Sequence, residues 1–364
     1  MKTSHAGNIR IKRAYFAYLK GPMRQSEQSV DAVAKALSRF EAYTRHKDFR
    51  TFRKEQAIGF QVHLAGQVNV RTKERLSKAT LFSTLAALKA FFLWLSGQPG
   101  FKSRLTYSDA DYFNLSAKDA AVAKAAREMP VPTIEQIRHV LFTMPNGTDI
   151  EKRNRALIAF TLLTGARDNA IASMRLRHVD IDAGKVDQDA RQVRTKYSKT
   201  FPTYFYPVGD DILAIFADWV MFLQLTQLWG LDDPLFPKTR IANGRNRLFK
   251  ASGLARECWS NADPIRTIFR KAFEAAGLPY YNPHSFRKTL ARLGHAVCRT
   301  LEQHKAWSQN LGHDDIRTTL VSYGTMPAVR QAELIRELGM PRASGEEIAD
   351  LVRRLADATG AGRV

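Results

Sequence analysis

Cysteine is almost absent from this chain of 364 residues, which contains only two, Cys258 and Cys298. Two cysteines cannot build a disulfide framework, and no Cys/His spacing typical of a metal site occurs. Long apolar runs are also missing, because stretches such as 86–95 contain a lysine and are too short to span a bilayer. The N-terminal segment has no apolar stretch of signal-peptide length. These absences predict a protein of the reducing cytoplasm without a membrane partner.

Several chemical signatures are missing as well. The sequence contains no GxxxxGK[ST] phosphate loop, no GxGxxG that opens a helix and no HExxH. Asp180, Asp182 and Asp187 lie near one another, but they are interpreted more simply as a solvated strand edge. A nucleotide-driven motor and a metal-dependent hydrolase are therefore disfavoured, and we expect neither a cofactor nor a metal.

Acidic residues are scarce relative to basic ones. The 56 Lys and Arg outnumber the 35 Asp and Glu, which gives a net charge of +21. The positive electrostatic potential of such a charge attracts polyanions, and nucleic acid is the commonest of these. An anionic membrane is the alternative, but no basic amphipathic helix with a clean apolar face supports it. Residues 1–115 hold 20 Lys and Arg against 8 Asp and Glu, a net +12, which indicates a DNA-gripping module.

The first third of the chain is predicted to be all helical. Residues 1–25 are interpreted as a loose basic arm. Within 26–115, apolar residues recur at helical spacing over 29–43 and 54–64, and a third helix starts after Ser77 and stops at Gly97. Residues 116–130 are rich in Ala, have little apolar periodicity and end at Pro130, with Pro132 just beyond, so they are predicted to be the linker between two domains.

The second domain is predicted over 131–330, beginning with a helix capped by Thr133. An apolar helix ends at Gly165. Three short strands follow, over 179–182, 186–193 and 203–208, and helices return at 212–228, 264–276 and 285–297. Amphipathic stretches after Tyr323 predict a C-terminal helical tail over 331–364. The expected fold class is mainly α with a small antiparallel β-sheet (α+β).

Four short segments carry residues suited to phosphate chemistry. They are Thr164-Gly165-Ala166-Arg167; Lys196-Tyr197-Ser198-Lys199 between two strands; His284-Ser285-Phe286-Arg287; and Leu311-Gly312-His313, followed by Tyr323. Each has an ordinary structural explanation when taken alone: a salt-bridged arginine, a solvated turn, a His–Arg pair, a packed tyrosine. Together they supply two arginines to clamp a phosphodiester, histidines and a lysine for proton transfer, and a tyrosine nucleophile.

The order of these segments resembles the tyrosine recombinase (phage integrase) family. The surrounding stretches, TGARDNAIASMRLRHVDID and QNLGHDDIRTTLVSYG, are similar to that family's first arginine box and its closing box. By the same resemblance, 26–115 corresponds to the helical core-binding domain and 131–330 to the catalytic domain. The individual motifs are weak, but five in the correct order are a specific signal.

The resemblance implies a role for six residues. Arg167 is the first catalytic arginine, His284 and Arg287 form the HxxR pair, His313 is the second histidine and Tyr323 is the nucleophile. Counting back from the proline that closes the next strand favours Lys199 as the lysine, and Lys196 stays open. Position 170 is alanine, where relatives commonly carry an acidic residue that supports the first arginine.

The implied function is site-specific DNA recombination. A tyrosine recombinase cleaves and rejoins DNA through a 3′-phosphotyrosyl intermediate without metal or ATP, for integration or excision of a mobile element. The implied partners are double-stranded recombination sites, three further copies of the chain in a homotetramer on two duplexes, and accessory DNA-bending proteins. The expected location is the cytoplasm, at the nucleoid. A type IB topoisomerase and a non-catalytic DNA-binding protein on the same fold are the alternatives.

Overall fold

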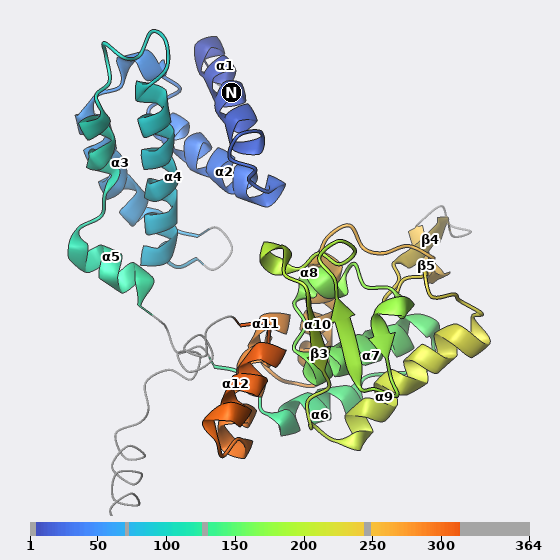
Figure 1. Ribbon diagram of the computed structural model, residues 1–364. Coiled ribbons are helices and arrows are strands. Elements are labelled where there is room, and N and C mark those ends of the chain that lie inside the picture. Colours follow the sequence, from blue (N-terminus) through green and yellow to red (C-terminus); the bar gives the residue numbers. More distant parts are fainter. Residues whose placement is uncertain (1–4, 70–72, 126–129, 244–248, 314–364) are drawn as a thin grey trace, which may run out of the picture. The chain divides into compact units, whose positions relative to one another are not determined.

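The chain forms two compact units, Met1–Arg127 and Glu128–Val364 (Figure 1). The computed structural model describes residues 5–69, 73–125, 130–243 and 249–313. The mainly helical fold class with small antiparallel sheets is confirmed by the elements of the two units.

Unit 1 is all helical over its described residues. Its helices are α1 (Ala6–Lys20), α2 (Glu27–Tyr43), α3 (Lys54–Gly66), α4 (Lys78–Ser96) and α5 (Ala117–Lys124), with 3₁₀ turns at Phe49–Thr51 and Tyr107–Phe113. The core is aromatic: the Phe40 ring meets those of Phe60, Phe92 and Phe113 edge-on, with centroids 5.2 to 5.6 Å apart. Ser77 caps α4 and Gly97 ends it, as predicted.

Helix α4 has the length and apolar composition of a membrane span, and 44% of that apolar window is buried inside the protein. Leu81, Leu85, Leu88, Phe92 and Leu95 are all at most 4% exposed. These side chains form the centre of the unit 1 core, so the apolar character of α4 is explained by packing.

The prediction of a loose arm over 1–25 is wrong for residues 6–20, which form α1. Tyr15 and Leu19 are each 3% exposed in the core of unit 1, and burial raises the pKa of Tyr15 to about 12. The Asn8 amide donates to the carboxylate of Glu41, which also pairs with Lys12. The apolar side chains lie four residues apart among basic ones, so a narrow stripe is enough to dock this basic helix.

The predicted linker 116–130 is partly helical. Ser116 caps α5, and Asp119 in its first turn lies 2.8 Å from the ammonium of Lys78 at the start of α4. The segment is therefore tied to unit 1 as far as Lys124.

Unit 2 combines helices with two small sheets. Its helices are α6 (Ile134–Thr143), α7 (Asp149–Thr164), α8 (Asp168–Ile171), α9 (Asp210–Met221), α10 (Asp263–Ala275), α11 (Pro283–Val297) and α12 (Leu301–Asn310); its strands are β1 (Val179–Asp180), β2 (Lys185–Gln188), β3 (Phe201–Tyr204), β4 (Thr239–Asn243) and β5 (Phe249–Leu254). Thr133 caps α6 as predicted. Helix α7 is buried on all sides over 156–164 and forms the centre of the core.

The three predicted strands form one antiparallel sheet in the order β1-β2-β3. In its register Val186 faces Thr203 and Gln188 faces Phe201, so the loop of 189–200 joins β2 to β3 and carries both candidate lysines. The hairpin of β4 and β5 was not predicted. A register shift between Thr239 and Ile241 interrupts the alternation that would have revealed it.

Candidate active site

Arg167 follows the end of α7. The chain turns there at Gly165, whose φ of +58° lies in the left-handed region that glycine adopts without strain. A Cβ at this position would meet Leu290 and Leu311 at 2.9 and 3.0 Å. Conformation and close packing therefore both require glycine in this turn, which leads directly to Arg167, the N-cap residue of α8.

His284 and Arg287 lie at the start of α11. Asn282 caps the helix, accepting a hydrogen bond from the Ser285 amide at 3.1 Å. Residues three apart share one side of a helix, so His284 and Arg287 project together from its N-terminal turns. Part of the His284 side chain is exposed to solvent. Partial desolvation of its ring lowers the pKa of His284, and the positive charges of Arg287 and Arg167 lower it further. The positive end of the helix dipole favours an anion here.

Arg287 connects three of the four predicted segments. Its side chain is buried, at 5% exposed, and donates from Nη1 to the carbonyl of Gly165 at 2.6 Å. From Nη2 it donates to the carbonyl of Leu311 and, at 3.0 Å, to Nε2 of His313. Burial and the neighbouring charge of Arg167 lower the pKa of Arg287 to about 9, so it remains a cation at neutral pH. One guanidinium thus fixes TGAR and LGH against α11.

His313 is a neutral imidazole in this arrangement. Burial lowers its pKa to about 4, together with the charges of Arg287, Arg167, His284 and Lys199. A guanidinium can only donate, so Nε2 of His313 is the acceptor and its ring proton belongs on Nδ1. The hydrogen bond thus joins Arg287 to His313, and the charges of Arg167, His284 and Lys199 act on the same ring.

The lowered pKa of His313 leads to a prediction for the free protein. Its ring should stay neutral until the pH falls to about 4, whereas an unfolded chain protonates histidine near 6.5. Between these values the unfolded state binds more protons, so this group makes the fold less stable as the pH falls through that window. An NMR titration of the histidine ring signals, assigned with His313→Gln, checks this. A midpoint near 6.5 for His313 would contradict it.

The structure distinguishes the two candidate lysines. Lys199 is half-buried and follows the 3₁₀ turn Lys196–Ser198, whereas Lys196 within that turn is exposed. Burial is the main cause of the lowered pKa of His313, and Lys199 is one of the charges that add to it, while Lys196 is not. This supports Lys199 as the lysine of the site.

Tyr323 and the predicted tail over 331–364 lie outside the described residues. The nucleophile therefore remains a prediction from sequence. The described chain ends at His313, ten residues before it.

The structure shows the setting of Ala170, the residue that stands where relatives commonly carry an acidic side chain. It is 1% exposed in α8, so its methyl group belongs to the core. The carboxylate near the site is instead Asp168, which pairs with Arg266 at 2.8 Å and acts on His284 in the direction that raises its pKa. The support expected from position 170 is thus absent, and Asp168 is the acidic residue beside Arg167.

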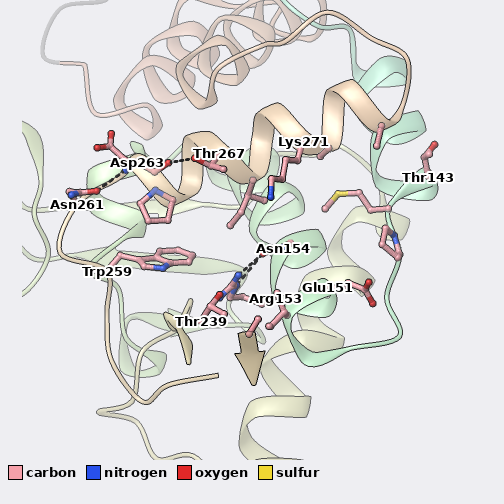
Figure 2. A pocket seen from close by; sticks show the side chains of 18 residues that line it. Thr143, Glu151, Arg153, Asn154, Thr239, Trp259, Asn261, Asp263, Thr267 and Lys271 are labelled. Atoms are coloured by element: carbon pink, nitrogen blue, oxygen red, sulfur yellow. Dashed lines mark hydrogen bonds between the residues drawn. The ribbon is translucent and has the colours of Figure 1, made fainter. Parts of the chain in front are cut away.

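A large pocket of about 800 Å³ lies elsewhere in unit 2 (Figure 2). Arg153 in its wall is 3% exposed, 5.2 Å from the Trp259 ring centre, and donates to the carbonyl of Pro237 and the hydroxyl of Thr239. These contacts tie α7 to the start of β4. No candidate catalytic residue lines this pocket. Among the described residues, no group of three His, Cys, Asp or Glu could hold a metal ion.

Structural comparison shows that the chain has the fold of the tyrosine recombinases. A lambda integrase (75–356) dimer bound to a COC′ core site matches with a TM-score of 0.59 and 13% identity, covering 88% of this chain and 97% of that one. The XerH site-specific recombinase bound to its palindromic difH substrate matches with a TM-score of 0.56 and 16% identity, covering 85% and 80%.

Sequence comparison gives the same class. Tyrosine recombinase XerC of Lactobacillus leichmannii is 20% identical over 313 residues, which are 85% of this chain and 92% of that protein. XerC of Escherichia coli O1:K1 / APEC is 27% identical over 169 residues, 46% of this chain. No family profile matches the chain. The resemblance to tyrosine recombinases drawn from the motifs is confirmed.

Proposed function

We propose that this protein is a site-specific tyrosine recombinase that cleaves and rejoins double-stranded DNA. The observation that carries the proposal is Arg287, a buried cation that links the TGAR turn, the HxxR helix and the LGH turn through three hydrogen bonds. The result is a cluster of cationic and imidazole groups at a helix N-terminus, which is the chemistry required to hold a phosphodiester.

The proposed reaction begins with attack of the Tyr323 oxygen on phosphorus. A bond forms between them, the bond from phosphorus to the 5′-oxygen breaks, and the DNA is left with a 3′-phosphotyrosine and a 5′-hydroxyl. His284 accepts the tyrosine proton and Lys199 supplies the proton to the leaving oxygen. Attack by the 5′-hydroxyl of a partner strand reverses these steps, so the bond energy is conserved and no ATP is required.

Arg167, Arg287 and His313 are assigned to the non-bridging phosphate oxygens. Negative charge accumulates on these oxygens in the transition state, and fixed donors in a partly desolvated site stabilise it. The burial of Arg287 and its placement by main-chain carbonyls support this role, because such a donor needs no reorganisation during the reaction.

The lysine assignment predicts a difference between two neighbouring variants. Lys199→Ala should slow cleavage by roughly 10²–10⁴-fold, the usual contribution of general acid catalysis, and Lys196→Ala far less. A substrate with sulfur in place of the bridging 5′-oxygen needs no general acid and should restore cleavage by Lys199→Ala. Single-turnover cleavage of both substrates measures this. A larger defect and restoration in Lys196→Ala would reverse the assignment.

Strand exchange decides between this function and its alternatives. A recombinase joins strands from two duplexes, whereas a type IB topoisomerase relaxes one duplex and a non-catalytic binder forms no adduct. We propose a homotetramer on two sites, acting with DNA-bending proteins in the cytoplasm at the nucleoid, in integration or excision of a mobile element. The experiment combines a nicked substrate that traps the adduct with a paired-site exchange assay. Adduct without exchange would favour the topoisomerase.

A further inference from the structure

The side chain of Asn310, at the end of α12, pairs with the backbone of strand β3. The backbone N–H of Tyr204 donates to Oδ1 of Asn310 at 2.7 Å, and Nδ2 of Asn310 donates back to the Tyr204 carbonyl at 2.8 Å. A side-chain amide that exchanges both hydrogen bonds with one residue copies the pairing of two antiparallel strands. Asn310 therefore acts as a one-residue extension of the sheet at the edge of β3.

Neighbouring contacts reinforce the pairing of Asn310 with Tyr204, which we call the β3–α12 joint. The Thr203 hydroxyl donates to the Asn310 carbonyl at 3.3 Å and accepts from Nε2 of Gln188 at 2.8 Å, with Gln188 and Thr203 both buried. The Phe201 ring lies so close to Gly312 that a Cβ there would meet it at 2.5 Å. The joint thus runs from β2 through β3 to Asn310 and Gly312, which stand three residues and one residue before His313.

The two sides of this joint are not equally anchored. Arg287 holds the segment after α12 independently of β3, through the Leu311 carbonyl and His313. Lys199, in contrast, stands two residues before β3 in a long loop. Backbone N–H groups of this loop hold it to itself and to the residues just after α8: the Ala190 N–H donates to the Thr200 hydroxyl at 3.0 Å, and the Arg194 N–H donates to the Ser173 hydroxyl at 2.9 Å. Loss of the joint should therefore displace Lys199 more than His313.

We propose that Asn310 is a positioning residue. It holds β3 against the LGH turn, so that Lys199, two residues before β3, faces the phosphate bound by Arg287 and His313. This inference rests on the proposed recombinase function and deepens it. A hydrogen-bonded joint outside the reacting groups acts on rate by orientation, and a misplacement of about 1 Å can cost about 100-fold.

The test measures single-turnover cleavage by Asn310→Ala on normal DNA and on DNA with a 5′-bridging sulfur. We expect a loss of roughly 10- to 100-fold on normal DNA and near wild-type cleavage on the sulfur substrate, because that substrate does not need the lysine. Asn310→Asp keeps the acceptor and loses the donor, so its defect should be intermediate. Gln309→Ala, an exposed neighbour, is the matched control and should cleave both substrates normally.

A double variant separates positioning from general damage. If Asn310 acts through the lysine, Asn310→Ala should slow a Lys199→Ala protein by less than about twofold, because the coupled residue is already missing. Thermal melting of each variant reports folding, and Asn310→Asp decides the matter if Asn310→Ala does not fold. Equal losses on both substrates, or a defect that adds fully to Lys199→Ala, would overturn the positioning role. Absence of an adduct with wild-type protein would instead overturn the recombinase proposal itself.

Discussion

Replacing Tyr323 by phenylalanine is expected to abolish covalent attachment to DNA and to leave DNA binding in place. The substitution removes only the nucleophilic oxygen and retains the ring. The cationic cluster of Arg167, Lys199 and Arg287 is unchanged by it, so phosphate binding should persist. A nicked suicide substrate, which traps the phosphotyrosine, followed by a denaturing gel, measures the adduct. A mobility-shift assay at one fixed salt concentration measures binding.

The matched control is Tyr280→Phe, which removes the hydroxyl of another tyrosine in unit 2. Tyr280 packs under the Arg270 guanidinium at 4.6 Å from the ring centre and lies outside the candidate site. This variant should form adduct like the wild-type protein. An adduct that persists in Tyr323→Phe would show that another residue is the nucleophile.

Helices were predictable where periodicity and end signals agreed. In α4 the apolar residues recur over five turns between a serine cap and Gly97, and in α6 the cap is Thr133. Helix α1 was missed because only a narrow stripe of its residues is apolar and basic residues dominate the rest. What folds it is docking onto two other helices, Tyr15 against Phe91 and Trp94 of α4 and Asn8 on Glu41 of α2, a tertiary effect that local propensity does not contain.

The hairpin of β4 and β5 was missed although a signal was present. Strand β4 ends at Asn243, and the next residue in the sequence is a glycine; the pair Asn-Gly is the strongest short-range indication of a hairpin. The irregular register and the glycine at position 253 obscured the alternation on either side.

The candidate site was predictable as a set of residues, but not as a network. Motif order selected Arg167, His284, Arg287 and His313, and the count back from Pro207 favoured Lys199; the structure joins Gly165, Arg287, Leu311 and His313 by hydrogen bonds, and the catalytic roles stay predictions. The sequence contains no indication that Arg287 is fixed by two main-chain carbonyls. Every residue carries a main-chain carbonyl, so the residue type does not show which carbonyls will accept from Arg287. That choice depends on how the turns meet in the folded chain.

These contacts give the site an electrostatic character that suits an anion. Arg287 is buried, and among the described residues its hydrogen-bond partners are carbonyl oxygens and an imidazole rather than a carboxylate. The nearby Asp168 carboxylate is paired with Arg266. Like charges brought together raise the free energy of the site, and a bound phosphate relieves that repulsion.

Replacing Arg287 by alanine is expected to lower both cleavage and stability. The Gly165 and Leu311 carbonyls would lose a buried donor, which typically costs about 1–3 kcal/mol for each unsatisfied group. Cleavage should fall by roughly 10²–10³-fold or more, the usual effect of removing one donor that stabilises transition-state charge. Arg287→Lys keeps the charge without the fork geometry that reaches several partners, so it should recover little activity. Single-turnover cleavage and thermal melting measure the two effects.

Arg292→Ala, on an exposed position of the same helix, is the control and should lower neither quantity by a comparable amount. Inorganic phosphate provides a readout that loss of packing alone would not change. It should raise the Tm of the wild-type protein by mass action and raise that of Arg287→Ala much less, because the principal anion ligand is gone. Equal stabilisation of both proteins by phosphate would show that Arg287 is a structural link between the three turns and not the phosphate ligand of the site.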